Sequence, residues 1–306
     1  MRIFLFVING LGVGSLPDIY KYEKEYHCTL DEIECNDLST FVKLGINKSA
    51  LKDLDKNTIG YCFRGRGLTD NTSFESGLNE ILGNITFNDS AQTQENLVDI
   101  LKKKNVNVIF ASSRQDSIAD IIYLDDKLVI ENCCDTASKD NSVIILELND
   151  FAKYGLNGDK QNMQGAIKYI DNFLDNFISN IEYRDILFIT GNFGINPTKI
   201  GITREYNPIF IYNKLVRGNS NLKTIQGNNS IAMTIVDLLN IYPNSHSIVD
   251  DSLKQKISVD NLFVKRDRIM SGIGKIKELN SKSVPKQKNK NNSDKNKIIK
   301  VKIVKK

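Results

Sequence analysis

Tryptophan is absent from this chain of 306 residues, and histidine, proline and cysteine are scarce, with two, five and five copies. Any imidazole ligand of a metal site must therefore come from His27 or His246. The odd number of cysteines argues against a complete disulfide framework, and no Cys-x-x-Cys pair suggests a structural zinc site. We expect reduced thiols without a catalytic role.

Long hydrophobic segments are also missing. No apolar run approaches the roughly 18 residues that suggest a membrane span. The apolar run at Ile3–Ile8 ends at Asn9-Gly10, too early for a signal peptide, and it predicts a buried first strand. These features predict a cytoplasmic protein without a transmembrane segment.

Charge is distributed unevenly along the chain. Residues 275–306 hold twelve lysines against Glu278 and Asp294, a net +10, so with +4 for the whole chain the rest carries −6. Much of this tail is too polar to offset the entropy of ordering, and we expect disorder. A solvated tail is the plain interpretation. Nonspecific attraction to an anionic partner, either nucleic acid or an acidic surface, is the alternative.

Strand-like and helix-like patterns alternate before the tail. The predicted strands are rich in Ile, Val and Phe without polar alternation, as in a sheet covered on both faces, and lie at 3–8, 106–111, 143–148, 186–190 and 208–212. Apolar residues spaced by three and four predict helices at 96–104 and 167–181, and Ser230 is a candidate N-cap for a helix to Leu239. The pattern predicts an α/β fold with a doubly wound, mostly parallel sheet and helices on both faces. We expect a core domain at 1–265 and a lysine-rich tail at 275–306.

The segment after the first strand is where an open α/β sheet binds ligands. Here it contains Gly10, Gly12 and Gly14. This G-x-G-x-G spacing differs from a dinucleotide fingerprint, and Pro17 stands where a helix should begin. The glycines alone are weak support for a nucleotide loop.

Several segments together resemble the phosphopentomutases of the alkaline phosphatase superfamily. The matching stretches are Val7–Asp18, Asp37–Ile46, Asp150–Gly155, Phe188–Thr198 and Thr203–Tyr212. Phe188-Ile-Thr-Gly-Asn-Phe-Gly-Ile-Asn-Pro-Thr is similar to the family's I-T-A-D-H-G-N-D-P-T, and Thr203-Arg-Glu-Tyr-Asn-Pro is similar to its T-R-E-Y-V-P. The resemblance implies an alkaline phosphatase-like core.

Family members hold two metal ions, typically manganese, on Asp and His side chains, which activate the nucleophile and clamp the phosphoryl oxygens. In this chain the first-strand Asp is Asn9, the Asp-His pair is Asn192-Phe193, and two further histidines fall at Leu156 and Ile202. A third carboxylate falls at Phe151, or at Asp150 after a one-residue shift. Asn removes the charge, while Phe, Leu and Ile have no lone pair to donate. We therefore predict no metal ligands and no metal cofactor.

The family's phosphorylated threonine and its second domain are altered as well. Ser73 falls on the nucleophile position, with Thr72 beside it, and both are candidate catalytic residues. As turn or capping residues they need no catalytic role. Only about a dozen residues separate Gly83 from Asn96, where the family inserts a large cap domain, so we expect no cap.

The sequence leaves two functions open. The first is a degenerate, non-catalytic phosphopentomutase-like protein that binds a protein or a phosphorylated or anionic ligand, with Asn9, Asn192, Asn196 and Arg204 as candidate ligand-binding residues. The second is a divergent metal-dependent phosphomutase or phosphohydrolase with residual activity on sugar phosphates, built on the remaining carboxylates.

Overall fold

The computed structural model describes residues 1–21, 25–34, 37–46, 58–83, 95–134, 142–214, 224–241 and 247–248. They belong to one compact unit, Met1–Leu262. The expectations for the tail at 275–306, for Cys35 and for His246 lie outside the described residues.

An eight-stranded sheet forms the centre of this unit, in the order β10-β2-β9-β6-β1-β5-β3-β4. Its strands are β1 (Arg2–Asn9), β2 (Tyr61–Arg66), β3 (Asn107–Ser112), β4 (Ile121–Ile122), β5 (Ser142–Leu148), β6 (Ile186–Asn192), β9 (Asn207–Tyr212) and β10 (Thr224–Gln226). Only β9 runs antiparallel to its neighbours, so the predicted doubly wound, mostly parallel sheet is confirmed. A separate antiparallel pair joins β7 (Gly194–Asn196) to β8 (Gly201–Thr203).

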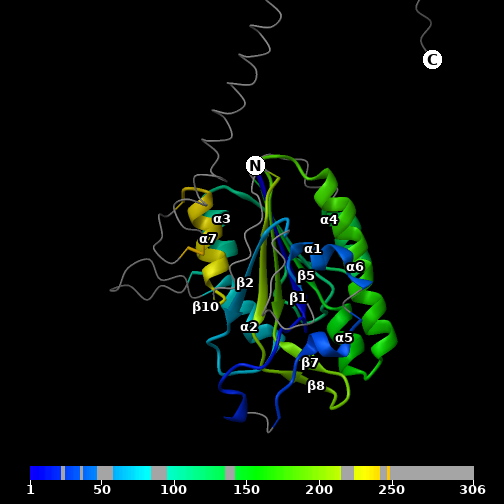
Figure 1. Ribbon diagram of the computed structural model, residues 1–306. Helices are drawn as coiled ribbons and strands as arrows, with labels where there is room; N and C mark the ends of the chain where they lie inside the picture. The colour runs from blue at the N-terminus through cyan, green and yellow to red at the C-terminus, as the bar shows by residue number, and fades with distance from the viewer. Residues whose placement is uncertain are drawn as a thin grey trace, which may run out of the picture. The chain divides into compact units, whose positions relative to one another are not determined.

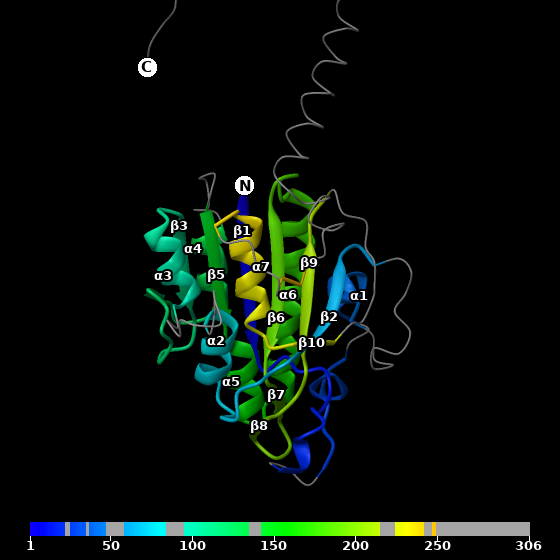
Figure 2. The same ribbon diagram turned by 90° about the vertical axis from the view of Figure 1, so that its left-hand side faces the viewer.

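Helices cover both faces of the sheet (Figures 1 and 2). One face carries α1 (Ser39–Leu44), α4 (Asp126–Cys134), α5 (Asp150–Leu156) and α6 (Lys160–Asn180), and the other carries α2 (Phe74–Leu82), α3 (Leu97–Lys103) and α7 (Ser230–Leu238). Two short 3₁₀ turns lie at Ile19–Lys21 and Thr29–Glu32. None of the helices among the described residues is long and apolar enough to cross a membrane.

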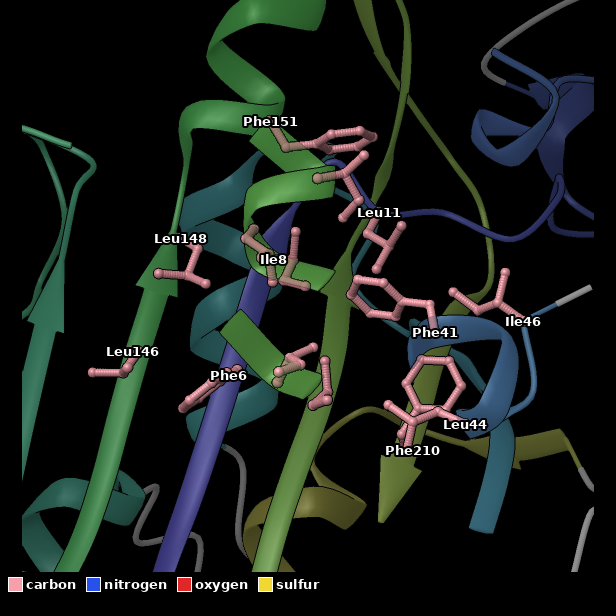
Figure 3. Packing of buried hydrophobic residues seen from close by; sticks show 14 of the residues in the cluster. Phe6, Ile8, Leu11, Phe41, Leu44, Ile46, Leu146, Leu148, Phe151 and Phe210 are labelled. Atoms are coloured by element: carbon pink, nitrogen blue, oxygen red, sulfur yellow. The ribbon is translucent and has the colours of Figure 1, made fainter. Parts of the chain in front are cut away.

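Each central strand contributes side chains to a hydrophobic core on either face of the sheet, because successive side chains of a strand point to opposite faces. In β1, Phe6 and Ile8 pack under α5 and α6, whereas Leu5 and Val7 pack under the opposite helices. Figure 3 shows part of the first of these cores, with Phe151 of α5 above Ile8 of β1 and Phe6 further down the same strand. A fully buried side chain of this size contributes roughly 1.5–3 kcal/mol.

The predicted strands and the helix at 96–104 lie within a few residues of their expected places, whereas the helix predicted at 167–181 begins seven residues earlier, as α6 (Lys160–Asn180). The predicted N-cap at Ser230 is wrong, because Asn229 precedes the helix and Ser230 is its first residue. The Ser230 hydroxyl instead donates to the carbonyl of Gly227 at 2.7 Å. Four of the five cysteines lie in described residues, and of these Cys28 and Cys62 are buried free thiols.

Candidate functional site

The carboxyl ends of β1, β5 and β6 lie side by side, and a buried amide–carboxylate network joins them. Asn9 and Asn192 are opposite each other in the ladder and wholly buried. Asn192 Nδ2 donates to Asn9 Oδ1 at 2.9 Å, and Asn9 Nδ2 donates to Glu147 Oε1 at 2.9 Å. The amide of Asn9 thus donates a hydrogen bond to a carboxylate, which an aspartate at this position cannot do while it is ionised.

Glu147 is a wholly buried acid at the end of β5, and Arg114 is its counter-charge. Arg114 Nε lies 2.7 Å from Glu147 Oε1, and the other carboxylate oxygen accepts from the hydroxyls of Ser112, at 2.7 Å, and Ser117. A buried carboxylate needs such a partner, because an unpaired charge in the interior is strongly destabilising. Arg114 is itself 7% exposed.

Nearby, the N-termini of α4 and α5 lie together, and the first Asp of each helix accepts hydrogen bonds from N–H groups at the start of the other. Asp126 at the start of α4 accepts from the N–H groups of Asn149 and Asp150, and Asp150 accepts from the N–H of Asp126 at 3.0 Å. Burial, followed by the charge of Asp150, raises the pKa of Asp126 to about 7. Both acids serve as helix caps in this arrangement.

Ser73 and Thr72 precede α2 on the other face of the sheet. Ser73 is the N-cap of α2: its Oγ accepts from the Ser76 N–H at 3.1 Å and donates to Ser76 Oγ at 3.0 Å. The capping interpretation of Ser73 is thereby confirmed, and its assignment as a nucleophile stays a prediction.

The structure does not bring all the candidate ligand-binding residues together. Asn9 and Asn192 meet inside the network described above. Asn196 accepts from the N–H groups of Thr198 and Lys199 in the β7–β8 turn. Arg204, only 2% exposed, pairs through Nε with Asp18 Oδ2 at 3.1 Å. Their roles in binding a ligand stay predictions.

The glycine loop after β1 is packed against a buried acid. The Gly14 N–H donates to Glu205 Oε2 at 2.9 Å, and a Cβ on Gly12 would lie 2.5 Å from that oxygen. Burial raises the pKa of Glu205. The glycines therefore allow close approach to Glu205.

A cavity of about 340 Å³ opens at this end of the sheet. It is lined by Ser73, Phe74, Glu75, Arg114, Asp116, Asn149, Lys153, Leu156 and Ile202. Leu156 and Ile202 are the positions where the resemblance places two metal-binding histidines. Neither Asn9 nor Asn192 lines the cavity.

Sequence reasoning missed Glu147 and Arg114, although a signal was present for each. Glu147 is the one charged residue in the apolar run Ser142–Leu148. Arg114 follows β3 by two residues, at the carboxyl end of the sheet.

The positions where the resemblance places metal ligands carry amide and hydrocarbon side chains in this chain. The Asn9 amide accepts from Asn192 and donates to Glu147, while Asn192 Oδ1 is buried without a hydrogen-bond partner among the described residues. Phe193, Leu156 and Ile202 are hydrocarbon side chains. Across the part of the chain that the structure describes, no group of three or more His, Cys, Asp or Glu residues is placed to hold a metal ion.

The sheet order, the two helical layers and this polar end define the class of protein. Residues 1–243 match the model of the Metalloenzyme superfamily, and the chain belongs to that family. Among solved structures, an alkaline phosphatase superfamily protein from Vibrio parahaemolyticus is similar over 82% of this chain and 69% of its own, with a TM-score of 0.51 and 10% identity. The PH0037 protein from Pyrococcus horikoshii is similar over 79% and 97%, with a TM-score of 0.50 and 8% identity. Both likenesses concern the fold alone.

Curated relatives narrow the likeness to phosphopentomutases. The enzyme of Alkaliphilus metalliredigens is 32% identical over 155 residues, which are 47% of this chain and 40% of the relative. That of Clostridioides difficile is 28% identical over 160 residues, 49% of this chain and 41% of the relative. The chain thus spans about 40% of the length of the curated relatives it matches. The predicted resemblance to phosphopentomutases of the alkaline phosphatase superfamily is confirmed.

Proposed function

We propose that this chain is a phosphopentomutase-like protein that does not catalyse phosphoryl transfer and acts by binding a protein or a phosphorylated or anionic ligand. The observation that carries the proposal is the chemistry of the buried network. Asn9 stands where the family has a charged metal ligand, and its amide is needed as a donor to Glu147 at 2.9 Å. At this position a divalent ion would find an uncharged amide instead of a carboxylate, with its N–H groups already donating to Glu147 and Asn149.

The other expected ligand positions support the same proposal. Phe193 is 4% exposed and packs in the hydrophobic core, and Leu156 and Ile202 pack against that core. Burial of these apolar groups stabilises the folded protein by about 25 cal/mol per Å² of apolar surface removed from water. A metal site here would need several new side chains.

The alternative is a divergent metal-dependent phosphomutase or phosphohydrolase acting on sugar phosphates. One observation favours it: the Ser73 side chain lines the cavity at the position of the family's nucleophile, with Glu75 beside it. A hydroxyl without a metal ion or a base in contact is a weak nucleophile. Ser73 Oγ is engaged with Ser76 instead.

The deciding experiment is a manganese titration by calorimetry on chelator-treated full-length protein, followed in the same sample by a ribose 1-phosphate mutase assay. The proposal predicts no binding heat and no turnover. An active phosphopentomutase treated in parallel controls for metal loading. Tight manganese binding or turnover would replace the proposal with the alternative.

Three further elements belong to the proposal: a cytoplasmic location, a division into a core at 1–265 and a tail at 275–306, and salt-dependent attraction of the tail to an anionic partner. The twelve lysines of the tail support the last of these. Removing 275–306 should weaken nucleic-acid binding in a salt titration, and unchanged affinity would contradict a role for the tail.

A further inference from the structure

The buried carboxylate of Glu147 holds Arg114 in the cavity wall, while the Nη2 atom of its guanidinium has no hydrogen-bond partner among the described residues. Its Nε bonds to the buried Glu147 at 2.7 Å, which fixes the side chain. Its Nη1 bonds to Asp116 Oδ1 at 2.9 Å. Its Nη2 is buried and has no hydrogen-bond partner among the described residues. A buried donor without an acceptor is destabilising by roughly 1–3 kcal/mol, so this group favours any oxygen that reaches it.

Asp116 is a weak competitor for the same guanidinium. Its side chain is 82% exposed, so its pairing with Nη1 is screened by water. An oxyanion that displaces Asp116 gains Nη1 and comes next to Nη2 of the same planar guanidinium, and paired contacts to a guanidinium are stronger than a single one. Glu147 stays in place during this exchange because it uses Nε.

Other residues with favourable charge line the same cavity. Lys153 brings a second cation from α5, and Ser73, Phe74 and Glu75 place the start of the nine-residue helix α2 in the cavity wall. The first N–H groups of a helix have no acceptor within the helix, and they favour negative charge. The Glu75 carboxylate opposes an anion on this wall, so the two cations are needed for binding.

We propose that this cavity binds a small oxyanion, a phosphate or carboxylate group, without a metal ion, through Arg114 and Lys153, and that Asp116 competes with the ligand. This inference rests on the proposed binding function of the same site and goes further by naming the ligand chemistry and the residues. Arg114 supplies from within the chain a positive charge that the relatives would draw from bound metal.

The test is a calorimetric titration of the full-length protein with inorganic phosphate and, in a second arm, with succinate, each with and without a chelator. We expect saturable binding that the chelator leaves unchanged, and the tighter of the two arms identifies the oxyanion. Binding that disappears with the chelator, or no binding in either arm, would overturn the inference.

Variants at the cavity rim make the test specific. Asp116→Asn should tighten binding by about threefold to tenfold, because the competitor loses its charge; a tenfold change corresponds to about 1.4 kcal/mol. The matched control Asp120→Asn removes an acid that is 48% exposed and paired with Lys102. If Asp120→Asn tightens binding as much as Asp116→Asn, general charge explains the result and the inference fails.

Removing a positive charge from the cavity should weaken oxyanion binding, the opposite of the effect expected for Asp116→Asn. Lys153→Met should weaken binding by about threefold to tenfold, whereas Lys168→Met, which removes a half-exposed lysine of α6, should change it less than twofold. Arg114→Lys keeps a positive charge beside Glu147 but removes the paired N–H donors of the guanidinium, so it should weaken oxyanion binding more than tenfold. If that variant does not fold, the exposed Asp116 and Lys153 variants decide alone. Equal weakening by both lysine variants would overturn the inference.

The two proposals fail separately. Manganese-dependent turnover of ribose 1-phosphate would remove the non-catalytic function and leave metal-free anion binding standing. A protein silent in the mutase assay that also binds no oxyanion would remove only the present inference.

Discussion

Restoring the family's aspartate at Asn9 should destabilise the protein and should not restore a metal site. Asn9→Asp replaces a donor with an acceptor 2.9 Å from Glu147 Oε1, and both side chains are wholly buried. Two unit charges about 3 Å apart repel by about 5 kcal/mol at an effective dielectric constant of about 20. Protonation of one of the two carboxyl groups requires less free energy than this repulsion, so we expect the variant to fold with one carboxyl protonated.

Protonation sets the expected size of the effect. Holding an aspartate with an ordinary pKa near 3.9 in its protonated form at pH 7 requires about 4 kcal/mol. The protonated carboxyl then donates to Glu147 as the amide did. We therefore expect the free energy of unfolding at pH 7 to fall by about 3–4 kcal/mol, and the difference from the native chain to shrink to about 1 kcal/mol near pH 4.5.

Urea unfolding followed by far-ultraviolet circular dichroism at several pH values measures both numbers. Asn172→Asp is the matched control, because it makes the same charge change on an exposed position of α6 and should stay within about 0.5 kcal/mol. A loss below 1 kcal/mol at pH 7, or a loss that does not shrink on acidification, would refute the account of the buried network. Manganese binding by this variant would refute the argument against a metal site.

Other variants test the caps and the glycine loop by the same unfolding assay. Burial raises the pKa of Asp126 from its ordinary value of 3.8 to about 7, so its stabilising contribution is present below about pH 4 and is lost as the pH rises through 7. Asp126→Asn should flatten this fall of stability with pH, and an unchanged slope would contradict the shift. Ser73→Ala should lose roughly 0.5–2 kcal/mol by removing the N-cap of α2, and no loss would contradict the capping role. Gly12→Ala should be destabilising by about 1–3 kcal/mol because its Cβ would meet Glu205, whereas Gly165→Ala, with open space around it in α6, should stabilise by about 0.5–1 kcal/mol; equal effects of the two alanines would contradict the close approach.

Strong local patterns explain what could be read from the chain alone. The apolar strands β1, β5 and β6 have no other stable place than the centre of a covered sheet, and α6 carries a stripe of Ile167, Ile170 and Leu174 that must be buried. The strands β2, β4, β7, β8 and β10 were not predicted. The last four have two or three residues each and follow from the pairing partner that the fold supplies, so their own sequence carries little signal. In β2, the two arginines and the glycine of Tyr61–Arg66 interrupt the apolar pattern.

At the candidate site, the sequence by itself determined which side chains are available. Asn9 and Asn192 remove two charges that a di-metal centre needs, and Leu156 and Ile202 offer no lone pair, wherever the chain places them. Only the tertiary structure decided that Glu147 lies within hydrogen-bond distance of Asn9 and that Arg114 neutralises it. These contacts join residues 138 and 33 positions apart, and no local pattern encodes them, because they arise where parallel strands far apart in the chain end together.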